Sequence, residues 1–599
     1  MSPASAPAVT SAAQLLMGLD DEQRVAAESL LGPVCVLAGA GTGKTRALTH
    51  RIAYGVATGV YPPARVMALT FTARAAGELR GRLRMLGAGA VAARTFHAAA
   101  LSQLGFFWPQ VVGGSMPRIA ASKGRIIADA AHSLRIKLDT ATLRDLAAEI
   151  EWRKVSRLTL EQYASLLPTR ALSAGLGVGA IGSDALVDLH QAYENTKDER
   201  RSIDFEDVLL AAAGMLESEP WVAQQVREQY RFYVVDEYQD VSPLQQTLLD
   251  LWLGDRQDLC VVGDASQTIY SFAGASADHL LGFASRYPDA AVIRLQQNYR
   301  STPAIVETAN QLMRDRPGAL VLRSARPADP ASRPTAPSAV GLSSAVEPCL
   351  MSFRDDRAEA RAIADAVLQQ IAQGIPPHEI AVLYRVNVQA AVIETALADA
   401  GVSYQVRGAQ RFFDLPEVKQ AVMMVKGATV AGTVEPLFKT VSDVLRSLGW
   451  TQDAPEGRGA VRDRWESLNA IITLAEEMPV GTTLRQFSDE LAERAAGQHE
   501  PTLPSVTLAT LHSAKGLEWQ SVFLAGLSEG LLPISYAKTD AAVEEERRLL
   551  YVGITRAQRF LALSWAEAAA GRSGKRRGSR FLPELRSRIR DDAPTTRST

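Results

Sequence analysis

A glycine-rich segment ending in Gly-Lys-Thr is the part of this sequence whose residue types and spacing point most directly to chemistry. The segment 37–52, LAGAGTGKTRALTHRI, follows an apolar run and has the pattern of a strand-to-helix turn. Glycines let such a turn curl so that backbone N–H groups face an anion, and the helix N-terminus adds a positive dipole. Lys44 suits the β- and γ-phosphates, and the Thr45 hydroxyl suits Mg²⁺. The expected nucleotide-binding residues are Gly39, Ala40, Gly41, Thr42, Gly43, Lys44, Thr45 and Arg46.

Two adjacent carboxylates end a second apolar run, YVVDEYQD at 233–240. Asp236 is placed to hold Mg²⁺ through water, and Glu237 to orient and deprotonate an attacking water. A lone Asp-Glu pair is common as a strand cap. A glycine-rich turn also occurs without a ligand, and here Ala38 stands where the strict pattern has Gly. Together the two features favour ATP with Mg²⁺, because α/β folds bring such strand ends side by side.

Hydrolysis also needs positive charge near the γ-phosphate. Arg300 in LQQNYRS and Arg556 in YVGITRAQ both fall in the second half of the chain. If a second domain presents them across a cleft, they are arginine fingers, which contribute orders of magnitude in rate. An ordinary surface salt bridge is the alternative for either arginine alone.

The elements that must position these residues follow a strand–helix alternation. The strand-like runs are almost continuously apolar, which is typical of parallel strands buried on both faces. One group precedes residue 290 and one follows it, so we expect an α/β protein with two parallel-sheet cores. Helical periodicity over 99–200 and 416–502 indicates insertions, and the Pro-, Ala- and Ser-rich 326–345 indicates a surface loop. The strand-like runs are 33–39, 65–71, 231–237, 258–264, 291–297, 379–385, 505–511 and 521–527.

Bulk composition narrows the class of protein. A chain of 599 residues is expected to have several domains. Because its net charge is −2, any binding of nucleic acid would have to use local grooves. The exception is the basic stretch 571–590. Three scattered cysteines argue against a zinc or disulfide scaffold, and no apolar run approaches the length of a membrane span. The N-terminal stretch lacks the pattern of a signal peptide. We therefore expect a cytoplasmic protein with no membrane partner.

The ordered motifs resemble those of the UvrD/Rep/PcrA group of superfamily 1A DNA helicases. Matching segments run from residue 18 to 582, among them GLDDEQRVAA, TFHA, IDFEDVLL and TLHSAKGLEW. The resemblance implies two RecA-like P-loop cores, 1A and 2A, with mainly helical insertion domains 1B and 2B. The implied division is 1A at 1–98 and 201–290, 1B at 99–200, 2A at 291–415 and 503–590, a shortened 2B at 416–502, and a tail at 591–599.

The same resemblance implies roles for single residues. Tyr299 would stack on adenine, Gln23 would bond its edge, and Glu518 would contact the ribose. The implied catalytic set is Lys44, Asp236, Glu237, Gln267, Arg300 and Arg556. The implied DNA contacts are Phe71, Thr95, His97, Phe205, Tyr270, Phe272 and His512. Base stacking is sequence-tolerant, which suits a motor that walks any sequence. Core packing is the alternative for each aromatic, and a structural hydrogen bond for each histidine.

Four departures from the family pattern shape the functional expectation. Ala273 and Phe272 stand where the family usually has Arg and Trp, and Gln296 stands where it has Glu. The 2B insertion is short, and 566–578, where the strand-separating hairpin belongs, has no aromatic tip. We therefore expect ATP-driven translocation, with weaker engagement of duplex DNA and less unwinding by the protein alone.

The leading hypothesis is an ATP-dependent 3′-to-5′ DNA helicase acting on single-stranded DNA and on single-strand/duplex junctions. It would serve repair or replication-fork maintenance, beside repair or replication proteins, as a monomer or a DNA-dependent dimer. One alternative is a translocase that strips proteins from single strands. Another is a non-motor nucleotide switch or scaffold. Residue chemistry does not distinguish DNA from RNA as the track.

Overall fold

The protein forms two compact units. The computed structural model describes residues 11–174, 181–327, 347–407, 412–429, 436–453, 460–479, 481–497, 504–569, 574–585 and 590–591. The first unit comprises residues 1–299, 313–325 and 536–548, and the second comprises 300–312, 326–535 and 549–599. Each unit has its own parallel sheet. This confirms the expected α/β class with two parallel-sheet cores.

The sheet of the first unit has six strands, all parallel to their neighbours. Its strands are almost wholly apolar, because helices cover both faces. Parallel pairing also places the carboxyl ends of all strands along one edge, where ligands bind in open α/β sheets. The order is β3 (Ala92–Thr95), β2 (Val66–Thr70), β6 (Phe232–Val235), β7 (Leu259–Gly263), β1 (Val34–Ala38) and β8 (Ala291–Leu295).

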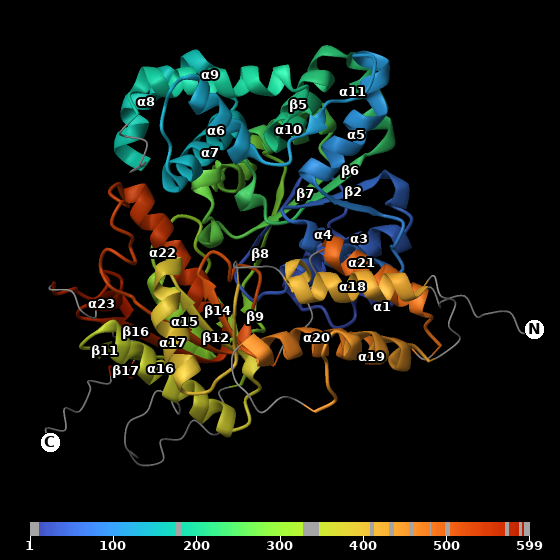
Figure 1. Cartoon of the computed structure of the whole chain (residues 1–599). Helices are drawn as coiled ribbons and strands as arrows, with labels where there is room; N and C mark the ends of the chain where they lie inside the picture. Colours follow the sequence, from blue (N-terminus) through green and yellow to red (C-terminus); the bar gives the residue numbers. More distant parts are fainter. Residues whose placement is uncertain are drawn as a thin grey trace, which may run out of the picture. The chain divides into compact units, whose positions relative to one another are not determined.

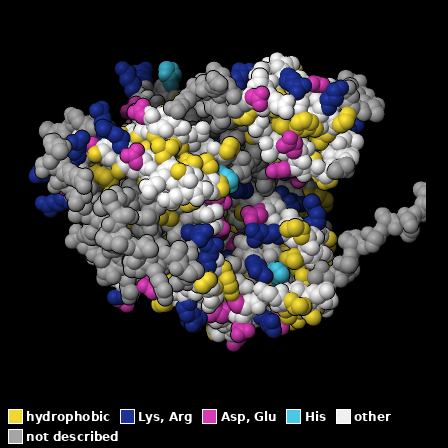
Figure 2. Space-filling view, turned by 90° about the horizontal axis from the view of Figure 1, so that it is seen from below, with side chains coloured by type: hydrophobic (Ala, Val, Ile, Leu, Met, Phe, Trp, Pro, Cys, Tyr) yellow, Lys and Arg dark blue, Asp and Glu magenta, His cyan; other side chains and the backbone are white. Residues whose placement is uncertain are grey.

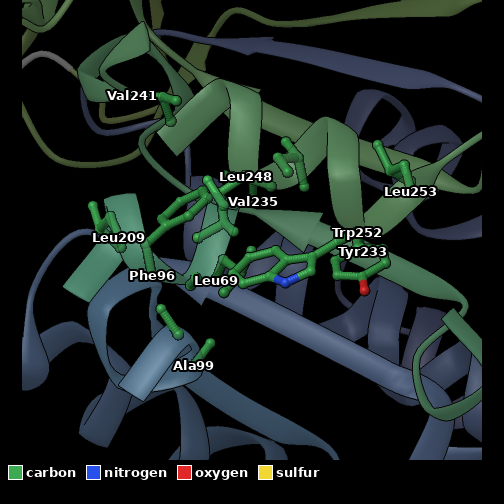
Figure 3. Close-up of a cluster of buried hydrophobic side chains, with 14 of the residues drawn as sticks. Leu69, Phe96, Ala99, Leu209, Tyr233, Val235, Val241, Leu248, Trp252 and Leu253 are labelled. Carbon is green, nitrogen blue, oxygen red and sulfur yellow. The ribbon is translucent and has the colours of Figure 1, made fainter. Parts of the chain in front are cut away.

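Two hydrophobic clusters hold helices against the two faces of this sheet. In one of them the ring of Trp252 stacks between Phe96 and Tyr233, at centroid distances of 6.0 and 6.1 Å (Figure 3). The helices on this face are α5 (Phe96–Val111), α10 (Phe205–Ser218), α11 (Pro220–Gln229) and α12 (Pro243–Leu253). Those on the other face are α1 (Ala12–Leu16), α2 (Asp21–Glu28), α3 (Lys44–Ala57) and α4 (Ala73–Met85) (Figure 1).

A helical insertion with its own core lies within the first unit. Its helices are α6 (Lys123–Ser133), α7 (Thr140–Val155), α8 (Leu160–Ala174) and α9 (Ser183–Glu199). The apolar side chains of its core fall between Ile126 and Tyr193. The sequence predicted a helical insertion from residue 99, but α5 packs into the core of the sheet. The separate core of the insertion therefore begins about 25 residues later than the sequence pattern suggests.

The second unit has a seven-stranded parallel sheet and a second helical insertion. Helices α16 (Asp356–Ala372) and α17 (Ala390–Asp399) pack on one face of the sheet. The insertion has a separate apolar core between Phe412 and Leu491. Its helices are α18 (Pro416–Ala428), α19 (Leu437–Ser447), α20 (Ala460–Glu476) and α21 (Leu484–Gly497). The strand order is β13 (Tyr404–Val406), β14 (Val506–Thr510), β12 (Ile380–Tyr384), β15 (Trp519–Leu524), β16 (Ala557–Ala566), β11 (Cys349–Phe353) and β17 (Arg590–Asp591).

One strand near the predicted boundary at residue 290 joins the other sheet. Strand β8 was expected in the second core, but it pairs with β1 along Val34↔Ala291 to Ala38↔Leu295 and completes the first sheet. An apolar run shows that a strand is buried, and it does not show which sheet the strand joins. The expected loop 326–345, the hairpin region 566–578, the basic stretch 571–590 and the tail 591–599 lie wholly or partly outside the described residues. In the described part of the chain, no helix has the length and apolar character needed to cross a membrane.

Candidate functional site

The phosphate loop joins the end of β1 to the start of α3. Gly41 and Gly43 have positive φ angles of 70° and 77°, which side chains with a Cβ rarely adopt. A Cβ added at Gly39 would lie 2.2 Å from a methyl group of Leu322, so the Leu322 side chain packs directly against this glycine. The Lys44 ammonium is buried with no hydrogen-bond partner among the described residues. A buried, unsatisfied cation at a helix N-terminus fits a polyphosphate.

Asp236 and Glu237 follow β6, as the sequence predicted. Burial, together with the neighbouring Glu237, raises the pKa of Asp236 to about 7, and Lys44 opposes the rise. Glu237 has a left-handed backbone with φ of 52°, and its N–H donates to the Asp236 carboxylate at 3.0 Å. Non-glycine residues rarely take this conformation, which turns the Glu237 side chain away from the strand direction. A carboxyl pair beside a buried ammonium is suited to a divalent cation held between protein and phosphate.

A buried glutamine that sequence reasoning missed connects the carboxylates to the next strand. Gln239 is fully buried, and its amide donates to the Glu237 carboxylate. Its amide oxygen accepts from the backbone N–H of Asp264, at the end of β7, at 3.0 Å. Asp264 in turn accepts from the Gln267 side chain at 2.7 Å. The only sequence signal was the position of Gln239 two residues after Glu237.

The residues expected to hold the adenine base lie beside the phosphate loop in the first unit. Gln23, which is buried, donates to the Thr42 carbonyl at 2.9 Å. The Tyr299 hydroxyl donates to the Asp20 carboxylate, and its backbone N–H donates to Gly41 at 2.9 Å. The ring of Tyr299 is 43% exposed and therefore accessible for stacking. Arg46 donates to the Gly18 carbonyl at 2.8 Å.

Three of the predicted DNA-contacting aromatics lie together beyond the ends of β2 and β7. The rings of Phe71 and Tyr270 are stacked, with centroids 5.6 Å apart and planes at 14°. Phe272 meets Tyr270 edge-on at 6.0 Å. Phe71 and Phe272 are 39% and 55% exposed, which core packing does not explain. Exposed rings in a row are suited to stacking on unpaired bases.

A fourth exposed ring, Phe205, lies at the start of α10 and is 58% exposed. His97 contacts it edge-on at 5.8 Å. Burial, helped by Lys123, lowers the pKa of His97 to about 4, so this ring is neutral at pH 7. The Thr95 hydroxyl accepts from the Ala98 N–H at 3.1 Å and caps α5, which gives Thr95 a structural role.

The remaining predicted site residues belong to the second unit. Arg300 donates to the Glu518 carboxylate at 2.5 Å and to the Thr555 carbonyl at 3.1 Å. Arg556 is 2% exposed, and its guanidinium donates to the carbonyls of Val552 and Leu517 at 3.1 and 3.0 Å. Its role as an arginine finger stays a prediction.

His512, at the end of β14, is partly buried in the second unit. Burial, with Arg385 and Lys515 nearby, lowers its pKa to about 3. A neutral imidazole can donate one hydrogen bond and accept another, and it adds no charge for phosphates. A DNA contact by His512 stays a prediction.

Charged side chains of both signs are interspersed on the described surface in Figure 2, where Lys and Arg alternate with Asp and Glu. This agrees with the net charge of −2. The face in Figure 2 shows no broad field of one sign on its described surface. Binding of a polyanion would therefore rest on local contacts and stacking.

Comparisons with known proteins give a consistent result over nearly the whole chain. Residues 19–288 match the UvrD/REP helicase N-terminal domain, and residues 293–430 and 434–568 match the UvrD-like helicase C-terminal domain. The chain is 45% identical over 597 residues to the ATP-dependent DNA helicase UvrD2 of Mycobacterium tuberculosis, covering 96% of this chain and 83% of the relative. It is 28% identical to the ATP-dependent DNA helicase PcrA of Bacillus subtilis, with coverages of 96% and 86%. It is 29% identical to DNA helicase II of Escherichia coli, with coverages of 95% and 88%.

Proposed function

The chain belongs to the UvrD/Rep family of helicases, and from this premise we propose that it moves 3′-to-5′ along single-stranded DNA in repair or replication-fork maintenance. It is an ATP-dependent DNA helicase of the UvrD/PcrA type, an enzyme whose ATP hydrolysis is stimulated by DNA. What we propose beyond family membership is the 3′-to-5′ direction of movement and the role in repair or replication-fork maintenance. Single-stranded DNA and single-strand/duplex junctions are the proposed substrates.

One observation supports the proposal above the others: a single sheet edge carries both sets of residues. The ends of β6 and β1 carry the carboxylates and the phosphate loop, and the end of β2 carries Phe71. Strand β7 leads through Asp264 and Gln267 to Tyr270 and Phe272. Because these strands are parallel neighbours, a nucleotide and a DNA strand would bind at the same edge.

The residues of the first unit have clear roles in hydrolysis under this proposal. The phosphate-loop N–H groups and Lys44 would bind the β- and γ-phosphates, and Thr45 and Asp236 would hold Mg²⁺, which would neutralise phosphate charge. Glu237 accepts a proton from the attacking water while the Gln239 amide orients its carboxylate. Gln267 donates a hydrogen bond to Asp264. It would also contact the γ-phosphate and so couple the presence of that phosphate to the aromatic segment that follows in the chain.

Ala273 favours a second candidate, a translocase that displaces proteins and unwinds duplex weakly. It lies in the 3-10 turn Ser271–Ala273, directly after Phe272, at the position where the family pattern given by the resemblance has Arg. A methyl group cannot make the charged contacts of a guanidinium, so force transfer from ATP to DNA would be reduced.

Two assays on the full chain test the proposal. We expect single-stranded DNA to stimulate ATP hydrolysis at least tenfold, and a 3′-tailed duplex to be opened in preference to a 5′-tailed one. Translocation on single strands without opening of the 3′-tailed duplex would support the protein-displacing alternative. An ATPase rate that DNA leaves unchanged would refute both and favour a nucleotide switch.

A further inference from the structure

We propose that Lys154 and Val155, at the C-terminal end of α7, are positioning residues that fix the spacing between two DNA-stacking segments, Phe205 and Tyr270–Phe272. The inference rests on the proposed function, because it concerns the DNA contacts of the same site. Under this inference, the helical insertion of the first unit helps to bind single-stranded DNA by holding the two aromatic segments in place.

The first contact is a buried group of charges at the start of α10. The Lys154 ammonium, 3% exposed, lies 2.7 Å from the Asp204 carboxylate and 2.5 Å from that of Asp207. These two aspartates form the capping box of α10, with bonds of 2.8 and 3.0 Å to each other's backbone N–H. Phe205 is the first residue of that helix. The direction of the exposed Phe205 ring therefore depends on the cap that Lys154 holds.

Further side chains of the insertion complete this group. Lys197 and Tyr193 of α9 reach the same aspartates, and the Tyr193 hydroxyl donates to Asp204 at 2.8 Å. Glu194 accepts from Arg153 at 2.8 Å and lies 3.3 Å from Lys154. Burial would raise the pKa of Asp204, but Lys154 and Lys197 hold it below its usual range. A charge buried in this way is costly to leave unpaired, so the network resists rearrangement.

The second contact is steric and involves the neighbouring residue. Val155 is buried, and its Cγ2 atom lies 2.5 Å from the position that a Cβ would take at Gly274. Gly274 has a positive φ of 83° and ends the 3-10 turn that carries Phe272. The absence of a side chain at 274 thus lets the end of α7 sit directly against the turn.

Through these two contacts, the end of α7 fixes the separation between the start of α10 and the turn that carries Phe272. Consecutive residues of one helix end touch the cap behind Phe205 and the turn behind Phe272. Arg157, just beyond the helix, donates to Glu217 of α10 and Thr247 of α12 at 3.1 Å each and secures the same end to the core. Since bases stack at a fixed spacing, a shift between the two aromatic segments would weaken DNA binding before it altered chemistry at the phosphates.

The test compares variants of the full chain in DNA-stimulated ATP hydrolysis. Lys154→Met and Val155→Ala are expected to raise the DNA concentration for half-maximal stimulation at least tenfold, while the rate at saturating DNA changes less than twofold. Lys154→Arg should recover most of the affinity, because it restores the charge. Lys137→Met is the matched control, since Lys137 is exposed in the same insertion, and it should behave as wild type.

A spectroscopic readout separates positioning from general stability. An oligonucleotide carrying 2-aminopurine reports base stacking, and Lys154→Met should lose the same signal change that Phe205→Ala loses. If Lys154→Met fails to fold, Val155→Ala alone decides the matter, and half-saturation within twofold of wild type in that variant would overturn the inference. Half-saturation within twofold of wild type in both Val155→Ala and Lys154→Met would overturn the inference. Absence of DNA stimulation in the wild type would instead overturn the proposed function.

Discussion

At the scale of single residues, the candidate site contains buried charged side chains whose charge the fold satisfies only in part. Lys44 has a buried ammonium without a hydrogen-bond partner among the described residues, and Asp236 has a pKa raised to about 7 by burial and by Glu237. Both arrangements are unfavourable without a ligand, because buried charges need partners. Lys44 offsets part of the charge of Asp236, and the phosphates and Mg²⁺ of a bound nucleotide would supply further opposite charge to both groups.

Replacing the carboxylate of Glu237 by an amide should separate binding from hydrolysis. Glu237→Gln keeps the shape of the side chain but cannot accept a proton from water, so turnover should fall about 10²- to 10⁴-fold. Nucleotide affinity should stay within about threefold, as measured by fluorescent ATP-analogue binding. Lys44→Ala is the contrasting variant, and it should lose both. Normal turnover in Glu237→Gln would show that another group activates the water.

Gln239 gives a second test at this scale, because its amide donates to Glu237 and accepts from Asp264. Gln239→Leu removes both bonds and leaves the Asp264 N–H unsatisfied, at a cost of about 1–3 kcal/mol. We expect turnover to fall about tenfold with nucleotide affinity preserved, since a misplaced base loses orientation. Gln224→Leu, at an exposed position of the same unit, is the control for the substitution itself. A loss of thermal stability without a loss of turnover would give Gln239 a purely structural role.

At the scale of elements, the sequence predicts where the strands lie, but it does not predict which sheet β8 joins. Runs such as Val34–Ala38 and Leu259–Gly263 were recognisable because strands buried on both faces are continuously apolar. The same pattern could not place β8, since burial does not specify a neighbour. Gln239 also escaped prediction, because the sequence does not show that its side chain reaches both Glu237 and Asp264. The Lys154 contacts escaped prediction because Asp204 and Asp207 lie far from Lys154 in the sequence. The strand-to-helix turn at residues 39–44 was predictable, because its glycine spacing before Gly-Lys-Thr is typical of such a turn, and its role as an anion site stays a prediction.

The buried histidine of α9 allows a pH prediction for the insertion. His190 is fully buried, stacks on Tyr163 of α8 at 4.6 Å, and has no hydrogen-bond partner for either nitrogen among the described residues. Burial, then Arg153 and Lys154, lower its pKa to about 3. The unfolded chain takes up this proton below about pH 6.5 and the native chain does not, so stability is lost as the pH falls from about 6.5 towards 3.

His190→Phe should therefore melt at a higher temperature than wild type at pH 5, where the unprotonated histidine costs about 2 kcal/mol, and the difference should shrink at pH 8. His132→Phe changes an exposed histidine of the same insertion and should leave the pH dependence of the melting midpoint unaltered. Parallel pH curves for wild type and His190→Phe would contradict the assignment.

At the scale of the whole molecule, the chain must hold a polyanion without being basic. Its net charge is −2 and its pI about 6.5, and charges of both signs alternate on the described surface in Figure 2. The exposed rings of Phe71, Phe205 and Phe272 are the features most suited to DNA. Under the proposed function, stacking on these rings would contribute affinity without depending on base sequence, which suits a motor that releases and re-engages successive bases.

The salt dependence of DNA binding tests this view of the molecule. Each phosphate neutralised on a single strand adds about −0.7 to the slope of log K against log salt, so a grip with about four phosphate contacts gives a slope near −3. We expect a slope no steeper than this for an unlabelled oligothymidine measured by anisotropy competition. Phe272→Ala should lower affinity about 10- to 100-fold at every salt concentration and leave the slope unchanged, because a stacked base contributes about 1–3 kcal/mol without releasing counterions. A slope steeper than about −5, or one that flattens in Phe272→Ala, would mean that phosphate contacts carry the binding and that Phe272 acts on them indirectly.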